Sequence, residues 1–315
     1  MQILFIDTAH PSLQKLLEKE GHHCIDGSGL TRTEIMNSVS GFEGVVIRSR
    51  IEIDKDVIDA ARNLIFIARI GSGMESIDVN YAESKGIACI NSPEGSHDAV
   101  GEHAVAMLLA LFNKLNKADR EVRNGDWVRE GNRGIEINGK TIGIIGYGQM
   151  GSSFAKKLSG FGCEVIAFDK YLKNFSNQFA KEVSMDEIFE RTDVLSLHVP
   201  LNKETAYLFD DNYIKRFKKN IYLINVARGR CVKTDDLVKN MKSGKVLGAC
   251  LDVIEYEDRS FEKFTLRTSE VMEDPSWQYL IHSDHVVFSP HIAGWTFESN
   301  EKMAKVLFEK IKARF

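Results

Sequence analysis

Proline and cysteine are both scarce in this chain, with five of each among 315 residues. No stretch rich in proline, glycine or serine marks a linker, so we expect helices to cross any domain boundary, near Asp98 and after His291. The cysteines are odd in number and scattered, and they form no C-x-x-C pair, which argues against a disulfide framework. We expect reduced, buried thiols and a cytoplasmic protein. No zinc site is predicted, because these histidines lack metal-ligand spacing with nearby cysteines or acids: His97, His103, His198, His282 and His285.

An excess of charge of either sign is also missing. Lysine and arginine total 41 and aspartate and glutamate 45, for a net charge of −4, so the composition predicts no binding to nucleic acid or to an anionic membrane. The longest apolar stretch, Ala104–Phe112, is far too short to span a bilayer. The first residues, MQILFIDTAH, are typical of a short strand ending at Asp7 and carry no basic leader, so we expect no targeting segment.

The length favours two domains, because 315 residues exceed one typical core. In the first hundred residues, short apolar runs alternate with helical patterns, which predicts a small parallel α/β sheet. The predicted strands there are Ile3–Ile6, Gly44–Ile47, Leu64–Ile70 and Ile87–Ile90, and the helices are Leu13–Lys19 and Asp54–Arg62.

A second alternation follows a helix that is predicted to run from Asp98 through Leu115 to the loop Asn124–Gly125, with one continuous apolar face. This alternation is typical of a doubly wound sheet, and the final helix comes after it. Its predicted elements are strands Thr141–Ile145, Glu164–Phe168, Val194–His198, Ile221–Asn225, Leu247–Leu251 and Val286–Phe288, and helices Ser152–Ser159 and Phe297–Ala313.

The run TIGIIGYGQMG places Gly146, Gly148 and Gly151 between a strand and a helix, at the spacing of a dinucleotide-binding turn. Gly146 allows the tight turn, Gly148 the close approach of a phosphate, and Gly151 the contact between helix and strand. Asp169 ends the next strand, 18 residues after Gly151, where a carboxylate can accept both ribose hydroxyls of an adenosine. Asp169 would repel a 2′-phosphate, so NAD is favoured over NADP, although the neighbouring Lys170 weakens this argument. The alternative for Asp169 is a solvated acid at the end of a strand.

Polar residues follow the later strands, at the edge where ligands bind in such sheets: His198 with Pro200, Asn225 leading to Arg228, and Asp252. The guanidinium of Arg228 could bind a carboxylate through paired N–H donors and polarise a neighbouring carbonyl. The alternative is a pairing with a structural acid.

Glu257 and His291 offer a carboxylate and an imidazole. An imidazole held by a carboxylate is a common device for proton transfer near neutral pH, because the carboxylate stabilises the charged ring. A single histidine is more often a hydrogen-bonded structural residue, so this pair gains weight only beside the other motifs.

Taken together, the order of motifs closely resembles that of the D-isomer-specific 2-hydroxyacid dehydrogenases, and in particular their phosphoglycerate dehydrogenase-like branch. The resemblance covers nearly the whole chain. It rests on VIRSR (46–50), ARIGSGMESID (68–78), NSPEG with DAVGEHAVAMLLAL (91–111), GKTIGIIGYGQMG (139–151), LSLHVPL (195–201), INVARGR (224–230), LDVIEYE (251–257) and SPHIAG (289–294).

The resemblance implies two Rossmann-like, doubly wound parallel-sheet α/β domains, with a cofactor domain (98–292) inserted into a discontinuous substrate domain (1–97 and 293–315). It implies NAD-dependent hydride transfer between a 2-hydroxy acid and a 2-keto acid, and a homodimer formed through the cofactor domain. Arg228 looks like the substrate-binding arginine, Glu257 like the acid that pairs with the catalytic histidine, and His291 like the general acid/base. The implied cofactor contacts are Gly146, Gly148, Gln149, Met150, Gly151, Asp169, His198, Val199, Pro200, Ala227, Asp252 and Gly294.

The resemblance also addresses the substrate. Ser72 and Gly73 match a loop whose N–H groups meet the substrate carboxylate, and Arg48 and Arg50 resemble residues that bind phosphate in phosphoglycerate-type enzymes. The alternative for the two arginines is surface pairing with Glu52 and Asp54. The substrate could therefore be 3-phosphoglycerate with 3-phosphohydroxypyruvate, or glyoxylate, hydroxypyruvate or another 2-keto acid.

Three further points remain open in the sequence. The charged stretch 258–285 could cap the cleft expected between the two domains or pack on the surface, and surface packing is favoured. This stretch contains Arg259, Lys263, Arg267, Trp277 and Tyr279. Trp295 could shape the substrate pocket or serve as a packing aromatic. An NAD(H)-sensing scaffold or corepressor is the alternative of another class, because fold alone does not imply catalysis. The chain stops soon after its final helix, so we expect no C-terminal regulatory domain and no serine feedback.

Overall fold

The computed structural model describes residues 1–257 and 269–315, and these divide into two compact α/β units. The first unit, discontinuous in sequence, comprises Met1–His97 and Trp295–Phe315. The second comprises Asp98–Glu257 and the described residues up to Gly294. Arg259, Lys263 and Arg267 of the charged stretch lie outside the described residues.

The first unit is built on a parallel sheet, which within the described residues has five strands in the order β2-β1-β3-β4-β5. Successive residues of β1 point to opposite faces, so Ile3 and Phe5 enter one core and Leu4 the other. The strands are β1 (Gln2–Phe5), β2 (His23–Asp26), β3 (Gly44–Ile47), β4 (Phe66–Arg69) and β5 (Ala88–Asn91).

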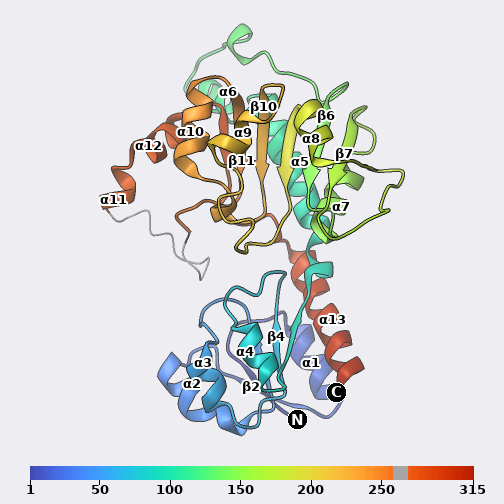
Figure 1. Ribbon diagram of the computed structural model, residues 1–315. Coiled ribbons are helices and arrows are strands. Elements are labelled where there is room, and N and C mark those ends of the chain that lie inside the picture. The colour runs from blue at the N-terminus through green and yellow to red at the C-terminus, as the bar shows by residue number, and fades with distance from the viewer. Residues whose placement is uncertain (258–268) are drawn as a thin grey trace. The chain divides into compact units, whose positions relative to one another are not determined.

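Helices cover both faces of this sheet (Figure 1). Two of them, α1 and α13, bury their apolar residues against one face, and α2, α3 and α4 against the other. Their bounds are α1 (Pro11–Lys19), α2 (Arg32–Ser38), α3 (Lys55–Ala60), α4 (Val79–Ser84) and α13 (Phe297–Arg314), with short 3₁₀ turns η1 (Val39–Gly41) and η2 (Pro93–Gly95).

The second unit holds a larger parallel sheet, with seven strands in the described residues and the order β12-β11-β10-β9-β6-β7-β8. The order reverses between β6 and β9, which creates the crevice where doubly wound sheets bind ligands. The strands are β6 (Thr141–Ile145), β7 (Glu164–Phe168), β8 (Lys181–Glu182), β9 (Val194–Leu197), β10 (Ile221–Asn225), β11 (Val246–Leu251) and β12 (Val286–Phe288). The predicted fold class, two doubly wound parallel-sheet domains, is confirmed.

Helices again line both faces, with α5 behind the sheet and α9 and α10 in front of it in Figure 1. One core joins α5 and α7 to the strands, and the other joins α8, α9, α10 and α12. The helices are α5 (His97–Phe112), α6 (Leu115–Arg123), α7 (Gln149–Lys157), α8 (Met185–Arg191), α9 (Asp211–Lys215), α10 (Thr234–Lys242), α11 (Ser269–Met272) and α12 (Pro275–His282), with 3₁₀ turns η3 (Glu130–Asn132) and η4 (Gly229–Cys231).

The prediction of a single long helix after Asp98 is wrong, because the helix is interrupted between α5 and α6. Lys114 adopts a left-handed conformation (φ 49°), which a helix cannot contain. The amide of Asn113 donates back to the carbonyl of Leu109, and the carbonyl of Phe112 accepts from Ile135. These hydrogen bonds satisfy carbonyl groups in the last turn of α5, so α6 begins as a separate helix.

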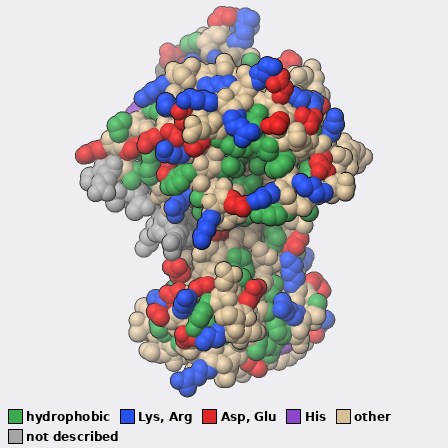
Figure 2. Space-filling model, in the orientation of Figure 1, with side chains coloured by type: hydrophobic (Ala, Val, Ile, Leu, Met, Phe, Trp, Pro, Cys, Tyr) green, Lys and Arg blue, Asp and Glu red, His purple; other side chains and the backbone are tan. Residues whose placement is uncertain are grey.

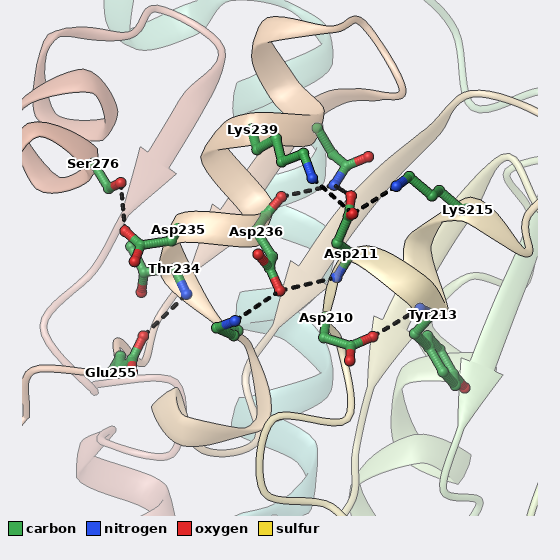
Figure 3. Close-up of polar contacts among 12 residues, drawn as sticks. Asp210, Asp211, Tyr213, Lys215, Thr234, Asp235, Asp236, Lys239, Glu255 and Ser276 are labelled. Carbon is green, nitrogen blue, oxygen red and sulfur yellow. Dashed lines mark hydrogen bonds and ion pairs between the residues drawn. The ribbon is translucent and has the colours of Figure 1, made fainter.

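The connection between α9 and α10 is held by side chains that cap and cross-link the two helices (Figure 3). Asp210 caps α9 by accepting from the N–H of Tyr213 at 2.8 Å. Asp211 accepts from Lys215 at 2.6 Å and from Lys239 of α10 at 2.8 Å. These lysines, with the amide of Asn240, hold the pKa of the Asp211 carboxyl well below its usual range.

The surface carries both signs of charge. In the face shown in Figure 2, positive and negative side chains are interspersed over both units. Among the described residues, no helix combines the length and apolar character needed to cross a bilayer. All five cysteines are free; Cys231 and Cys250 are buried, but Cys24, Cys89 and Cys163 are only half-buried, so the expectation of five buried thiols is wrong for those three.

Candidate functional site

The glycine turn joins β6 to α7 beside the end of β9. Gly146 has φ +90°, and a Cβ placed there would come within 2.5 Å of the carbonyl oxygen of His198. A Cβ on Gly151 would lie 2.0 Å from the carbonyl oxygen of Gly146. Both positions therefore require glycine for the turn itself.

Gly148 differs from these two glycines. It is the N-cap of α7, and a Cβ there would meet no described atom within 4 Å. There is thus space beside Gly148 at the N-terminal, positive end of α7, and a helix N-terminus is the kind of position that binds a pyrophosphate.

Asp169 lies next to this turn. Its Oδ2 accepts from the N–H of Tyr147 at 2.8 Å, and its Oδ1 accepts from Tyr171 at 2.8 Å and Leu172 at 2.9 Å. Burial acts to raise the pKa of Asp169, but the N–H groups of Leu172, Tyr147 and Tyr171 outweigh burial and lower it. The carboxylate is therefore ionised and fixed in direction. Lys170 pairs with Glu204.

His198 follows β9 beneath the turn. Its Nε2 lies 2.8 Å from the hydroxyl of Ser196, and its ring packs against Phe154. Burial lowers the pKa of His198 to about 3, so the ring is neutral and does not supply a proton near neutral pH.

Glu257 and His291 are brought together. The Nδ1 of His291 lies 2.8 Å from Oε2 of Glu257, and Oε1 of Glu257 accepts from the N–H of Ile254 at 2.6 Å. Because a carboxylate accepts, Nδ1 carries the proton that is shared with Glu257, and Nε2 is the other ring nitrogen. The two side chains are 25% and 15% exposed, so the pair is sheltered but reachable.

Arg228 leaves β10 in an extended conformation and is linked to the same pair through the backbone. The amide of Asn225 donates to the Arg228 carbonyl at 3.0 Å. The next residue, Gly229, packs so closely that a Cβ would lie 1.8 Å from the carbonyl oxygen of Ile254, the residue whose N–H holds Glu257. The turn after β10 and the Glu257 segment are thus fixed against each other.

Asp252 follows β11 and is 1% exposed. Its carboxylate accepts from the hydroxyl of Ser289 at 2.6 Å and from the N–H groups of Ile292 at 2.9 Å and Ala293 at 3.0 Å. Its main-chain carbonyl accepts from the N–H of His291 at 2.7 Å. Asp252 therefore organises the loop that carries His291.

Sequence reasoning missed this arrangement at two positions. Ser289 was not singled out, and His103 was considered only as a metal ligand, yet both contact Asp252. The signal that could have found Ser289 is its place two residues before His291. No signal marks His103, because its partners come from strands far along the chain. Within residues 1–257 and 269–315, no group of three or more His, Cys, Asp or Glu is arranged to hold a metal ion.

In the first unit, the two predicted substrate arginines differ. Arg50 donates to Asp7 at 3.2 Å, to the carbonyl of Leu30 at 2.8 Å and to that of Ile6 at 2.5 Å. Asp7 is 5% exposed, so this is an internal ion pair that favours a structural role for Arg50, with an acid other than the two considered in the sequence. Asp54 pairs with Arg32 instead.

Arg48 sits differently. Its guanidinium lies 3.8 Å from the centre of the Trp295 ring, and its carbonyl accepts from Nε of Arg69 at 3.2 Å. On the neighbouring strand end, the carbonyl of Ser72 accepts from the amide of Asn91 at 2.7 Å, and Ser72 and Gly73 are half-buried.

Part of the stretch 258–285 is described, from 269 onward. Trp277 is 6% exposed and its ring packs against Tyr256 and Phe288. Tyr279 packs on the core of the second unit. This part of the stretch is therefore anchored by its aromatic residues.

Residues 105–293 match the family model described as D-isomer specific 2-hydroxyacid dehydrogenase, NAD binding domain. The chain belongs to this dehydrogenase family. The predicted family and the predicted cofactor, NAD, are confirmed, and the glycine turn with Asp169 fits that cofactor.

Among the dehydrogenase relatives, D-3-phosphoglycerate dehydrogenase of Archaeoglobus fulgidus is 34% identical over 313 residues, covering 99% of this chain and 56% of the relative. Hydroxypyruvate reductase of Thermotoga maritima is 33% identical over 298 residues, covering 95% and 92%. D-lactate dehydrogenase from Aquifex aeolicus, solved with NAD and lactic acid, has a TM-score of 0.82 at 27% identity, covering 99% and 95%. The chain spans about half the length of the phosphoglycerate dehydrogenase relative.

Proposed function

We propose that this chain catalyses reversible hydride transfer between NAD(H) and a D-2-hydroxy acid or its 2-keto acid. The observation that carries the proposal is the 2.8 Å contact between His291 and Glu257, in the same unit as the glycine turn and fixed against the turn that bears Arg228. NAD(H), when bound, would supply the hydride that C2 of the 2-keto acid gains and would accept the hydride that C2 of the 2-hydroxy acid loses.

His291 acts as general acid/base. In the reductive direction, its Nε2–H gives a proton to the carbonyl oxygen as C2 gains the hydride, leaving a hydroxyl group and a neutral imidazole; in oxidation Nε2 takes the proton back. Glu257 keeps the other proton on Nδ1 and stabilises the charged ring. The pair therefore delivers a proton from a fixed direction.

Arg228 binds the substrate carboxylate and stabilises the charge that develops on the carbonyl oxygen. Its backbone is fixed by Asn225 and by the contact of Gly229 with Ile254, so the guanidinium starts from a rigid turn. Ser72 and Gly73, half-buried residues of the first unit, are proposed to meet the carboxylate as well.

We assign the cofactor to the inserted region 98–292 and the substrate to 1–97 with 293–315. The turn Gly146–Gly151 would hold the pyrophosphate, and Asp169 the adenosine ribose. The remaining proposed contacts lie at or near the ends of the sheet's strands: Gln149, Met150, His198, Val199, Pro200, Ala227, Asp252 and Gly294.

The test is NADH oxidation with 3-phosphohydroxypyruvate, hydroxypyruvate, glyoxylate, pyruvate and longer 2-keto acids, using wild type and His291→Ala. We expect turnover with at least one acid, its loss in His291→Ala, and unchanged NADH binding by fluorescence. His282→Ala, on the exposed side of α12, is the matched control. Tight NADH binding without turnover on any acid would favour an NAD(H)-sensing scaffold instead.

We propose that the substrate carries a second anionic group, with 3-phosphohydroxypyruvate as the leading candidate. Stacking on Trp295 fixes the plane of the Arg48 guanidinium, and a planar fork of N–H donors suits a phosphate or carboxylate. Trp295 follows His291 by four residues. One relative is named for phosphoglycerate and another for hydroxypyruvate, so the unphosphorylated acid is the second candidate.

We further propose a homodimer formed through the second unit. All residues of α6 are at least partly exposed, and the segment after it extends away from the sheet (Figure 1). Large apolar side chains are exposed to solvent in α6 and in the segment after it, and exposed apolar patches are typical of surfaces that another chain covers. The exposed fractions are 59% for Leu115, 53% for Val122, 81% for Trp127, 46% for Val128 and 40% for Ile135. Trp127→Asp should convert a dimer into a monomer in analytical ultracentrifugation.

A cytoplasmic location is part of the same proposal. It is supported by five cysteines that are all free, since paired cysteines are typical of oxidising compartments. Localisation of the tagged chain by fractionation tests it.

A further inference from the structure

The helix α5 brings a second histidine to the loop that carries His291. The Nε2 of His103 lies 2.8 Å from the hydroxyl oxygen of Ser289 and 3.5 Å from Oδ1 of Asp252. The imidazole is 24% exposed, and the residue after it, Ala104, is fully buried in the core. His103 is thus attached to a packed helix, whereas Ser289 and Asp252 follow the ends of strands.

The direction of these hydrogen bonds follows from their donors and acceptors. Both oxygens of Asp252 accept from backbone N–H groups, those of Ile292 and Ala293, so the carboxylate acts as an acceptor. The hydroxyl of Ser289, at 2.6 Å, donates its one hydrogen to that carboxylate. Its oxygen must then accept from His103, which places a proton on Nε2 of His103.

The segment held in this way has an unfavourable backbone. His291 has φ 54°, a left-handed conformation that a residue with a Cβ adopts only when its surroundings impose it. Asp252 supplies that constraint on both sides: its carboxylate holds Ser289 before His291 and Ile292 and Ala293 after it. The conformation of His291 therefore depends on where the Asp252 carboxylate is fixed.

We propose that His103 is a positioning residue for the reaction. Its Nε2–H, through Ser289, anchors the Asp252 carboxylate to α5 and so holds the left-handed backbone of His291, from which the imidazole reaches Glu257. His103 touches neither substrate nor cofactor in this role. The inference rests on the proposed function only for the step that His291 performs.

The first experiment measures the loop without any substrate. Amide hydrogen exchange of Ile292 and Ala293, and the low-field Nδ1–H resonance of His291, are recorded for wild type, His103→Leu and His103→Gln. We expect exchange in His103→Leu to be roughly fivefold faster or more, as for the loss of one hydrogen bond, and the Nδ1–H resonance to weaken. His103→Gln, whose amide can donate near the Nε2 position, should restore both, and His282→Leu is the matched control.

The second experiment measures the reaction. In His103→Leu, kcat should fall about tenfold, because a small misplacement of the proton donor is costly, while KM for the acid stays unchanged. His103→Gln should recover most of kcat. Ser289→Ala breaks the same relay, so the double variant His103→Leu/Ser289→Ala should be no worse than the poorer single variant.

Several outcomes would overturn the inference. Wild-type exchange rates at Ile292 and Ala293 in His103→Leu would do so, as would additive losses in the double variant or a failure of His103→Gln to recover. If His103→Leu does not fold, Ser289→Ala, which breaks the same hydrogen-bond chain, carries the same two measurements with the same expected losses. Absence of turnover in wild type would contradict the proposed function, and the exchange data would still decide the role of His103.

Discussion

The Nδ1 atom of His291 and the Oε2 atom of Glu257 lie 2.8 Å apart, although 34 residues separate them in the chain. The opposite oxygen of Glu257 is held at 2.6 Å by the N–H of Ile254, so the carboxylate cannot rotate without losing a hydrogen bond. The imidazole is oriented by an acid that is itself oriented by backbone. Because the carboxylate of Glu257 is itself held in place, the imidazole of His291 has a fixed orientation from which to donate a proton.

Replacing Glu257 by Gln tests the pair. The amide keeps the shape but removes the charge that stabilises the imidazolium, so we expect kcat to fall about 10²- to 10⁴-fold, the range typical of a lost acid/base contribution. NADH binding should not change. Steady-state kinetics with the best keto acid measures this, and Glu190→Gln, at an exposed ion pair with Lys218, is the control. Equal losses in both variants would count against a specific role for Glu257.

The glycine turn allows binding to be separated from folding. Gly148 has room for a Cβ among the described atoms and an ordinary φ of −74°, but alanine is a poorer N-cap than glycine, so Gly148→Ala should change the free energy of unfolding by less than about 1 kcal/mol. The added methyl would occupy the space that a pyrophosphate needs, and Kd for NADH should rise about tenfold or more. Fluorescence titration and urea unfolding measure the two quantities.

Gly151→Ala is the contrasting change. Its Cβ would lie 2.0 Å from a backbone oxygen of Gly146, so the helix and strand must move apart. We expect a loss of stability of about 1–3 kcal/mol, as for overpacking of a core, together with weaker NADH binding. A variant as stable as wild type would mean that the close contact does not constrain the turn.

The strands around the sites were predictable because buried parallel strands are continuous apolar runs: β6, β7, β10 and β12 have the expected bounds. The strands β2 (His23–Asp26) and β8 (Lys181–Glu182) were not predicted, because both are largely exposed at sheet edges and carry charged residues. The break at Lys114 was not predictable from periodicity, since Leu115 continues the apolar face of α5 by sequence alone.

Sequence-based prediction of the site residues has the same limit, because periodicity does not reveal contacts between distant segments. Motif order predicts one site for Arg228, Glu257 and His291, but the ion pair of Arg50 with Asp7 joins the end of β1 to the end of β3 and leaves no mark in local sequence. The contact of His103 with Ser289 spans 186 residues for the same reason. Contacts between distant segments depend on strand order, which periodicity does not encode.

Asp211 gives a prediction about pH. Hydrogen bonds from Lys215, Lys239 and Asn240 lower its pKa in the folded chain. A carboxyl group with a lowered pKa binds fewer protons when folded, so its stabilisation is complete above the unfolded pKa of about 3.9 and is lost as pH falls through the folded pKa. Asp211→Asn should therefore lower the thermal midpoint near neutral pH, and the difference from wild type should shrink below about pH 4.

Thermal melts across this pH range check the effect, with Asp186→Asn as the control, since Asp186 is 93% exposed and its ion pair with Arg216 is long, at 3.6 Å. A difference between wild type and Asp211→Asn that stays constant with pH would show that packing, not charge, is responsible.

The two arginines of the RSR segment should behave differently when changed. Arg50→Met removes one partner of an internal ion pair with Asp7, and we expect the free energy of unfolding to fall by about 3 kcal/mol with no selective effect on any one acid. Arg48→Met should raise KM for 3-phosphohydroxypyruvate about tenfold relative to pyruvate, because only the phosphorylated acid carries the second anionic group.

Trp295 provides the last test of this substrate assignment. Its ring lies 3.8 Å from the Arg48 guanidinium and is 62% exposed, so the stacking contributes about 0.5–1 kcal/mol. Trp295→Leu should therefore raise KM for the phosphorylated acid roughly two- to fivefold, and Trp295→Phe, which keeps an aromatic face, should raise it less. In an Arg48→Met background the Trp295→Leu change should have no further effect on KM, because the residue it positions is gone. Equal effects of Trp295→Leu in both backgrounds would show that Trp295 acts independently of Arg48.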